Sequence, residues 1–162
     1  MDDLSNIARN LYRMSNRLSD GLADGVEKTA GRVRDTAKGK LGDYQDGWPT
    51  LKDRTVAQKM KKNKKAAKKH KQKHGGLVAT GTSADAPLID SGQLRASIRI
   101  EMNRAALSAR VGSSVIHAAT HEFGDDERGI PERPHLRPSL KEETDKHLIS
   151  DLREGVRRRV GF

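Results

Sequence analysis

The stretch 94-LRASIRIEMNRAALSARV-111 alternates apolar and polar residues on both sides of a short turn. Alternation with a period of two is typical of a β-strand with one buried face. Because the turn falls at 103–106 and the alternation resumes at Leu107, we predict an antiparallel hairpin. A short helical turn directly after Asp90-Ser91-Gly92 is an alternative for the first residues of the stretch.

Residues 1–42 show a helical pattern, because apolar residues recur every three or four positions. This predicts one long amphipathic helix of roughly 57 Å at about 1.5 Å per residue. Packing on the chain's own core and packing on neighbouring subunits are equal alternatives for it. The apolar positions are Leu4, Ile7, Leu11, Met14, Leu18, Leu22, Val26, Ala30, Val33 and Ala37. The glycines, which mark either bends or close approach to another helix, are Gly21, Gly25, Gly31 and Gly39.

The C-terminal third predicts a short helix, a loop and a final helix. The short helix covers 115–123 and ends at Gly124, a residue suited to a helix C-terminus. Prolines forbid regular structure across 125–137. Ser139 and Glu142 form a capping box that would open the final helix, whose apolar face would hold Leu140, Leu148, Leu152 and Val156. The predicted class is α+β, with a small antiparallel sheet packed by helices.

Three parts are expected along the chain. They are the long helix at 1–46, a Trp-Pro anchor with a lysine-rich extended arm at 47–86, and a compact core at 87–162. Only 33% of the 162 residues are hydrophobic and 3% are aromatic, which favours a small core and an oligomer over a free monomer.

Composition also excludes several classes of protein. The chain has no cysteine, so it forms no disulfide and no thiolate metal site. No apolar run approaches the roughly 18 residues of a membrane span, and the N-terminus lacks a secretory signal core. We therefore expect no membrane partner, and a protein that stays in a host cytoplasm or in a particle assembled there.

The stretch TVAQKMKKNKKAAKKHKQK at 55–73 concentrates the net charge of +10. A solvated mobile arm, contact with an acidic protein and contact with nucleic acid are the alternatives for it. Contact with phosphates would be strongly salt-dependent, and the absence of interleaved aromatic residues argues against sequence-specific single-strand binding. The candidate contacts are Lys61, Lys62, Lys64, Lys65, Lys68, Lys69, Lys71 and Lys73.

Nothing in the sequence assembles an enzyme active site. His117 and His121 stand four residues apart, but Glu122 does not follow the first histidine as it does in zinc proteases, and His135 is the one further strong candidate ligand nearby. A metal hydrolase is therefore the weakest alternative. The carboxylates at 125–127 are consecutive on a loop, and no nucleophile, base and orienting group occur together. We predict no enzymatic activity, cofactor or metal.

Four motifs between 47 and 139 occur in an order that resembles the virion morphogenesis and tail-completion proteins of tailed bacteriophages. The motifs are Gly47-Trp48-Pro49-Thr50-Leu51 followed by Thr55 and Lys59; Leu88-Ile89-Asp90-Ser91-Gly92-Gln93-Leu94-Arg95-Ala96-Ser97-Ile98; Val111-Gly112-Ser113 with His117-Ala118-Ala119-Thr120-His121-Glu122-Phe123-Gly124; and Ile130-Pro131-Glu132-Arg133-Pro134-His135-Leu136-Arg137-Pro138-Ser139. His117 and His135 depart from the family, which usually has Tyr and Phe there. The first 40 residues carry no family motif.

The resemblance implies a structural virion protein. Its copies would form a ring, sixfold in symmetry, at the head-proximal end of the tail, in contact with tail-tube and neck proteins. Apart from the resemblance, the lysine-rich arm leaves packaged DNA and an acidic protein surface as alternative further contacts. The alternative function is a non-specific nucleic-acid-binding module. The motif residues expected at interfaces are Trp48, Leu51, Ser91, Gly92, Leu94, Ile98, Gly112, His121, Glu122, Phe123, Gly124, Pro131, Arg133, Pro134 and Leu136.

Physical roles follow for some of these motif residues. Trp48, between Gly and Pro, is expected to anchor a loop in the core, and Phe123 and Leu136 are expected to be further apolar anchors. Arg133 lies on a stiff proline loop, where it would pair with a carboxylate such as Glu122 or with a neighbouring subunit.

Overall fold

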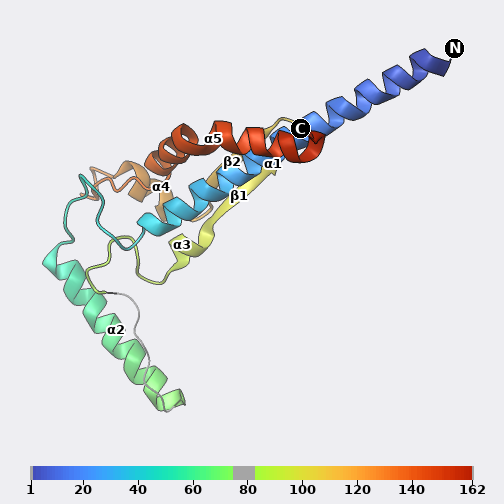
Figure 1. Cartoon of the computed structure of the whole chain (residues 1–162). Helices are drawn as coiled ribbons and strands as arrows, with labels where there is room; N and C mark the ends of the chain where they lie inside the picture. The colour runs from blue at the N-terminus through green and yellow to red at the C-terminus, as the bar shows by residue number, and fades with distance from the viewer. Residues whose placement is uncertain (1, 75–82, 162) are drawn as a thin grey trace. The chain divides into compact units, whose positions relative to one another are not determined.

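The computed structural model describes residues 2–74 and 83–161, and it confirms the α+β class. Its elements, coloured along the chain in Figure 1, are α1 (Asp2–Lys40), α2 (Asp53–His74), α3 (Gln93–Ser97), β1 (Ile98–Asn103), β2 (Ser108–Ser113), α4 (Ile116–Phe123) and α5 (Leu136–Val160). They divide into two compact units. Unit 1 comprises 1–37, 98–113 and 136–162, and unit 2 comprises 38–97 and 114–135.

Unit 1 contains the predicted antiparallel hairpin. β1 pairs with β2 in a register that places Ile98 opposite Ser113 and Ile100 opposite Val111. Burial alternates along β1 as the sequence pattern predicts, with Ile98 1% exposed. The residues before Ile98 form helix α3 rather than strand, so the helical alternative for the start of this stretch is the right one.

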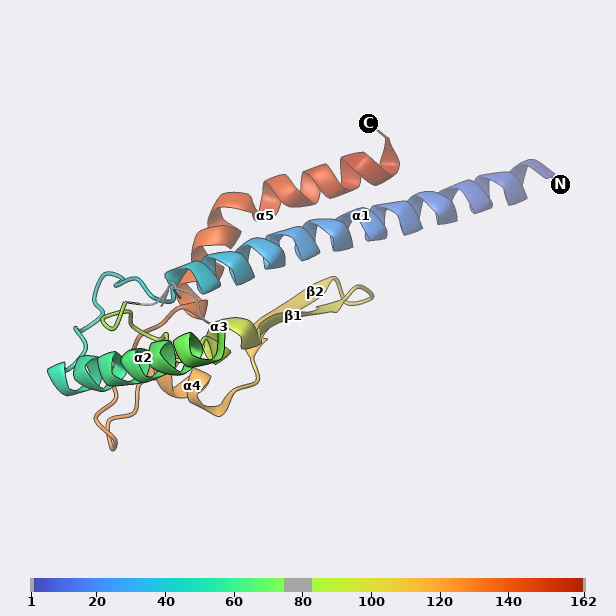
Figure 2. The same cartoon turned by 90° about the horizontal axis from the view of Figure 1, so that it is seen from below.

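Glycines bring α1 and α5 into contact in unit 1, where the two helices lie side by side (Figures 1 and 2). A Cβ atom on Gly25 would lie 2.6 Å from the Cα atom of Leu152, and one on Gly21 would lie 2.7 Å from the Cα atom of Val156. On α5, a Cβ atom on Gly155 would lie 2.1 Å from the carbonyl oxygen of Gly21. Gly21 and Gly25 therefore serve close helix approach and not bends, because α1 is continuous through both.

A buried carboxylate joins the same two helices. Asp151 of α5 is 2% exposed, and it accepts hydrogen bonds from Thr29 (3.2 Å) and Arg32 (3.0 Å) of α1. It also forms an ion pair of 3.1 Å with Lys28 of the same helix. Burial alone would raise the pKa of Asp151, but the hydrogen bonds from Arg32 and Lys28, with the charge of Arg32, outweigh it and hold the pKa below its usual value. The carboxylate is thus ionised in the folded chain.

Replacing Asp151 with Asn is expected to lower the free energy of unfolding by about 1–3 kcal/mol at neutral pH, because two cations lose their buried partner. A lowered folded-state pKa means that the carboxylate stabilises the fold above its unfolded pKa of about 3.9 and ceases to do so as pH falls through the folded value. The difference between wild type and Asp151→Asn should therefore shrink in strong acid. Urea unfolding of wild type and Asp151→Asn at neutral pH and in strong acid measures the two free energies of unfolding. The same difference between them under both conditions would contradict the prediction.

The N-terminal part of α1 leaves its apolar side chains uncovered. In Figures 1 and 2 these turns project beyond the end of α5. The exposed apolar stripe comprises Leu4 (76% exposed), Ile7 (54%), Leu11 (62%), Met14 (50%) and Leu18 (43%). From Ala23 onward, in contrast, α1 has buried apolar residues, which include Ala30, Val33 and Ala37. One chain therefore covers the second half of the predicted amphipathic face and leaves the first half open.

The lysine-rich segment, expected as an extended arm, is helical as α2. Lys, Ala and Gln are good helix formers, and Asp53 in the first turn complements the helix dipole. The first half of α2 is also tied down within unit 2, since Lys59 donates to the carbonyl oxygen of Ala86 and Lys62 pairs with Asp90 at 2.7 Å. These two contacts offset the repulsion among the lysines, which would otherwise favour disorder in this segment.

Two other expectations need correction. The final helix begins at Leu136, before the proposed capping box, because Pro138 falls in the first turn, where a proline removes no helical hydrogen bond. Ser139 is instead a fully buried residue inside α5, and Leu140 is 53% exposed. Phe123, expected as an apolar anchor and as an interface residue, is 60% exposed at the end of α4 and therefore takes no part in the core of this chain. Trp48 is buried as predicted, with 8% of its surface exposed.

Candidate functional site: a pocket lined by the four motifs

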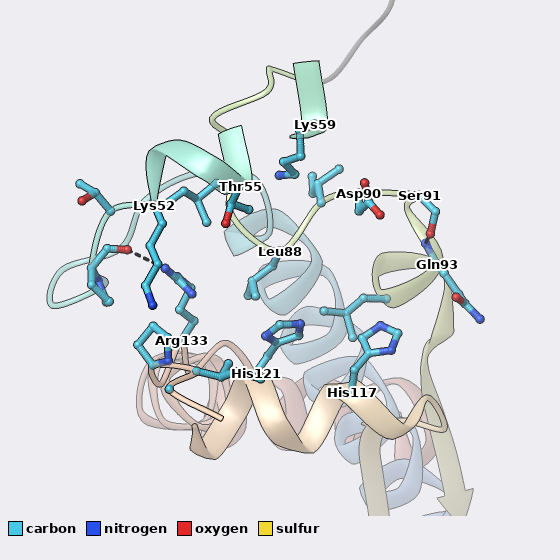
Figure 3. A pocket seen from close by; sticks show the side chains of 18 of the residues that line it. Lys52, Thr55, Lys59, Leu88, Asp90, Ser91, Gln93, His117, His121 and Arg133 are labelled. Atoms are coloured by element: carbon cyan, nitrogen blue, oxygen red, sulfur yellow. Dashed lines mark hydrogen bonds between the residues drawn. The ribbon is translucent and has the colours of Figure 1, made fainter. Parts of the chain in front are cut away.

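An open pocket of about 900 Å³ lies in unit 2, and residues from all four motif segments line it. In Figure 3, His117 and His121 of α4 point toward the pocket, while Lys59 reaches it from α2. The motif residues in the lining are Pro49, Thr50, Leu51, Thr55 and Lys59; Leu88, Ile89, Asp90, Ser91, Gly92, Gln93 and Leu94; His117 and His121; and Ile130, Pro131 and Arg133. Segments more than 80 positions apart in the sequence therefore meet at one site.

Hydrogen bonds between loops hold the first two motifs beside each other. Gly42 N–H donates to the carbonyl oxygen of Pro87 at 3.0 Å. The Tyr44 hydroxyl donates to Asp85 at 2.7 Å and accepts from the backbone N–H of Leu51 at 3.0 Å. The loop that carries Trp48 and Leu51 is thus fixed against the segment that precedes α3.

The third and fourth motifs are joined by a buried acid. Glu122 is 3% exposed and accepts a hydrogen bond from the backbone N–H of His135 at 2.8 Å, with Nδ1 of His135 3.0 Å from the same oxygen. The backbone N–H of Arg133 donates to the carbonyl oxygen of His121 at 2.7 Å. Glu122 therefore organises the proline loop through His135, and not through the ion pair with Arg133 that the sequence suggested.

Gly124 makes the sharp turn that leads from α4 into this loop. Its φ is +76°, a conformation that favours glycine, and a Cβ atom there would lie 3.0–3.2 Å from Glu132 and Ile130. The turn lets Asp125 and Ile130 exchange backbone hydrogen bonds of 2.8 Å. Arg133 is thereby placed on a closed, stiff loop.

The pocket is lined by three cations, Lys52, Lys59 and Arg133, and by two acids, Asp90 and Asp126. Arg133 is 6% exposed, and burial lowers the pKa of its guanidinium. Burial likewise lowers the pKa of Lys59, against the opposing charges of Asp90 and Asp85. For His121, burial is the main cause of a lowered pKa, followed by the charges of His117, Arg133 and His135. Arg133 and Lys59 are thus partly desolvated cations, a state that an anionic partner would relieve, whereas the lowered pKa of His121 favours its neutral imidazole.

Other predicted site residues lie elsewhere. Ile98, Gly112 and Leu136 belong to unit 1, so the pocket does not include them. Glu122 supports the loop from outside the lining, and Pro134 is likewise not a lining residue. Lys61, Lys62, Lys64, Lys65 and Lys68 are exposed on α2, whereas the side chains of Lys69, Lys71 and Lys73 fall outside the described residues. Sequence reasoning missed Lys52, which lines the pocket and carries no signal of its own.

Side chains that could ligate a metal ion do not cluster in the part of the chain that the structure describes. Across 2–74 and 83–161 no group of three or more His, Cys, Asp or Glu side chains is placed to share a metal ion. His117 and His121 instead lie edge to face, with ring centroids 5.8 Å apart. In the same part of the chain, no helix has the length and apolar character that crossing a membrane requires.

Comparison with protein-family models, with curated protein sequences and with solved structures gave no match for this chain.

Proposed function

We propose that this chain is a non-enzymatic structural protein that works by assembling with other proteins. More specifically, we propose a tail-completion protein of a tailed bacteriophage, located in the virion and forming a ring at the neck that joins tail to head. The observation that carries this proposal is the meeting of the four family-like motifs at one pocket of unit 2. Motifs with unrelated local roles would have no reason to line a common site.

Two surface features support an assembly role. The exposed apolar stripe of α1 offers five large side chains that one chain leaves in water. Exposed apolar patches of this kind mark interaction sites in soluble proteins. Phe123 adds a further exposed apolar residue, within the third motif. In the proposed ring, these surfaces would contact neighbouring copies, tail-tube subunits or neck proteins.

Electron microscopy of phage particles assembled without this protein tests the proposal. Abnormally long tails are expected if the ring terminates the tail, and free normal tails beside full heads are expected if it joins tail to head. Supplying the protein from a plasmid should restore infectious particles. Normal tails that join heads efficiently in its absence would refute the proposal.

A second candidate, non-specific nucleic-acid binding, is favoured by α2. No acidic residue occurs between Arg54 and His74, and the described lysine side chains there are exposed, apart from the partly buried Lys59. Lys62 is already paired with Asp90, so Lys61, Lys64, Lys65 and Lys68 are the better contacts.

Changing Lys61, Lys64, Lys65 and Lys68 together to Gln tests this second candidate. If they contact phosphates, DNA affinity should fall, and the slope of log K against log salt should become shallower by about 3–4. Fluorescence anisotropy between about 50 and 200 mM salt measures the slope. Lys141→Gln with Lys146→Gln on α5 is the control, and equal slopes in both variants would exclude the helix as a DNA contact.

A further inference from the structure

Arg133 contributes a buried guanidinium group to the lining of the unit 2 pocket. Arg133 donates one hydrogen bond from Nη2 to the carbonyl oxygen of Pro49 at 2.8 Å, drawn as a dashed line in Figure 3. Its Nε atom has no hydrogen-bond partner although it is buried. Within the described residues no carboxylate pairs with this guanidinium. A buried charge in this state is costly unless a ligand completes it.

A second buried polar atom without a partner lies close to the first. Nδ1 of His121 is buried without a hydrogen-bond partner, and His121 senses the charge of Arg133. The backbone bond from Arg133 N–H to the His121 carbonyl oxygen, at 2.7 Å, keeps the two residues adjacent. Lys59 and Lys52 add positive charge to the same lining. The lining holds three cations, Lys52, Lys59 and Arg133, against two acids, Asp90 and Asp126. Of these acids, Asp90 pairs with Lys62 at 2.7 Å.

The rest of the lining is apolar and sets the size of the ligand. Leu51, Leu88, Ile89, Leu94 and Ile130 border the pocket, whose volume of about 900 Å³ far exceeds a single small anion. A ligand that fits must bring an anionic group for Arg133 and apolar groups around it. Guanidinium groups bind carboxylates through two parallel hydrogen bonds, a geometry that the unpartnered Nε would help to form.

We propose that this pocket binds a carboxylate side chain of a partner protein, presented within an apolar peptide segment, with Arg133 as the anchor and His121 as a second polar contact. The source of the segment, a neighbouring virion protein, rests on the proposed function. The preference of the pocket for a carboxylate does not rest on the proposed function, because it is tested on the purified full-length protein without any virion protein.

The test is an NMR titration of the full-length protein with two matched peptides, acetyl-Leu-Asp-Leu-amide and acetyl-Leu-Asn-Leu-amide. The Asp peptide is expected to shift the Arg133 Nε–H and His121 ring resonances and to bind at least about tenfold more tightly than the Asn peptide. Acetate and inorganic phosphate are titrated as separate probes, and both are expected to bind more weakly than the Asp peptide. Equal binding of the two peptides, or tighter binding of phosphate, would overturn the proposal.

Variants then assign the contact to Arg133. Arg133→Gln should reduce affinity for the Asp peptide by at least about tenfold, while Arg133→Lys should retain part of it. Arg128→Gln is the matched control, because Arg128 is exposed, lies on the same loop and pairs with Asp125 outside the lining. If Arg133→Gln does not fold, His121→Asn supplies the second variant, with an expected loss of several-fold. Wild-type affinity in a folded Arg133→Gln or His121→Asn variant would refute the assignment.

Discussion

Gly25→Ala is expected to lower the free energy of unfolding by about 2 kcal/mol, although alanine is the better helix former. The added Cβ atom would lie 2.6 Å from the Cα atom of Leu152 and 2.8 Å from the carbonyl oxygen of Asp151. Both atoms are backbone, so no side chain can rotate away, and α5 itself must move. That movement would also pull Asp151 from Thr29 and Arg32.

Gly31→Ala in the same helix is the matched control. A Cβ atom at Gly31 meets nothing within 4 Å, so only helix propensity changes, and stability should rise by up to about 1 kcal/mol. Urea unfolding followed by far-UV circular dichroism compares both variants with wild type. The opposite signs expected for the same chemical change make the test sharp. Equal effects of the two substitutions would show that close packing of α1 on α5 does not stabilise unit 1.

These glycines also show where sequence reasoning stops. The spacing of apolar residues was sufficient to predict a helix over 1–42, because periodicity is a local property of the chain. The same spacing left each glycine as either a bend or a point of close approach to another helix. The choice depends on the helix that packs against it, which lies more than 100 positions away in the sequence. Gly21 and Gly25 prove to be contact sites because the backbone of α5 lies against them, at Gly155 and Val156 and at Asp151 and Leu152 respectively. Gly31 and Gly39 meet nothing, and no feature of the sequence separates the two pairs.

The candidate site was predictable in its segments but not in its contacts. The motifs identified Arg133, Glu122 and His121, and the pocket does lie among them. The sequence paired Arg133 with Glu122 because the residue types are complementary. His135 takes that carboxylate instead, with its backbone N–H at 2.8 Å and its ring Nδ1 at 3.0 Å from the same oxygen. Whether Glu122 contacts Arg133 or His135 depends on the geometry of the loop. The turn at Gly124 sets that geometry, and a sequence motif alone does not reveal it.

Purified wild-type protein is expected to self-associate through α1, and the double change Ile7→Asp with Leu11→Asp should abolish that association. The exposed stripe has steps of 3, 4, 3 and 4 residues from Leu4 to Leu18, the spacing of a coiled-coil seam. A seam of this kind is covered most simply by the same stripe of a second copy. Each buried Leu or Ile side chain contributes about 1.5–3 kcal/mol, so two charges at the seam should raise Kd more than about a hundredfold.

Asn6→Asp with Asn16→Asp carries the same change in charge on the opposite side of the helix, where both residues are exposed, and it should leave association intact. Sedimentation velocity over a range of protein concentrations compares the three chains. The stripe variant should also keep the unfolding free energy of unit 1, because Ile7 and Leu11 make up none of its buried core. This separates loss of an interface from loss of the fold. A wild-type chain that sediments as a monomer at every concentration would leave the stripe for a different protein, and an unchanged stripe variant would place the self-contact elsewhere.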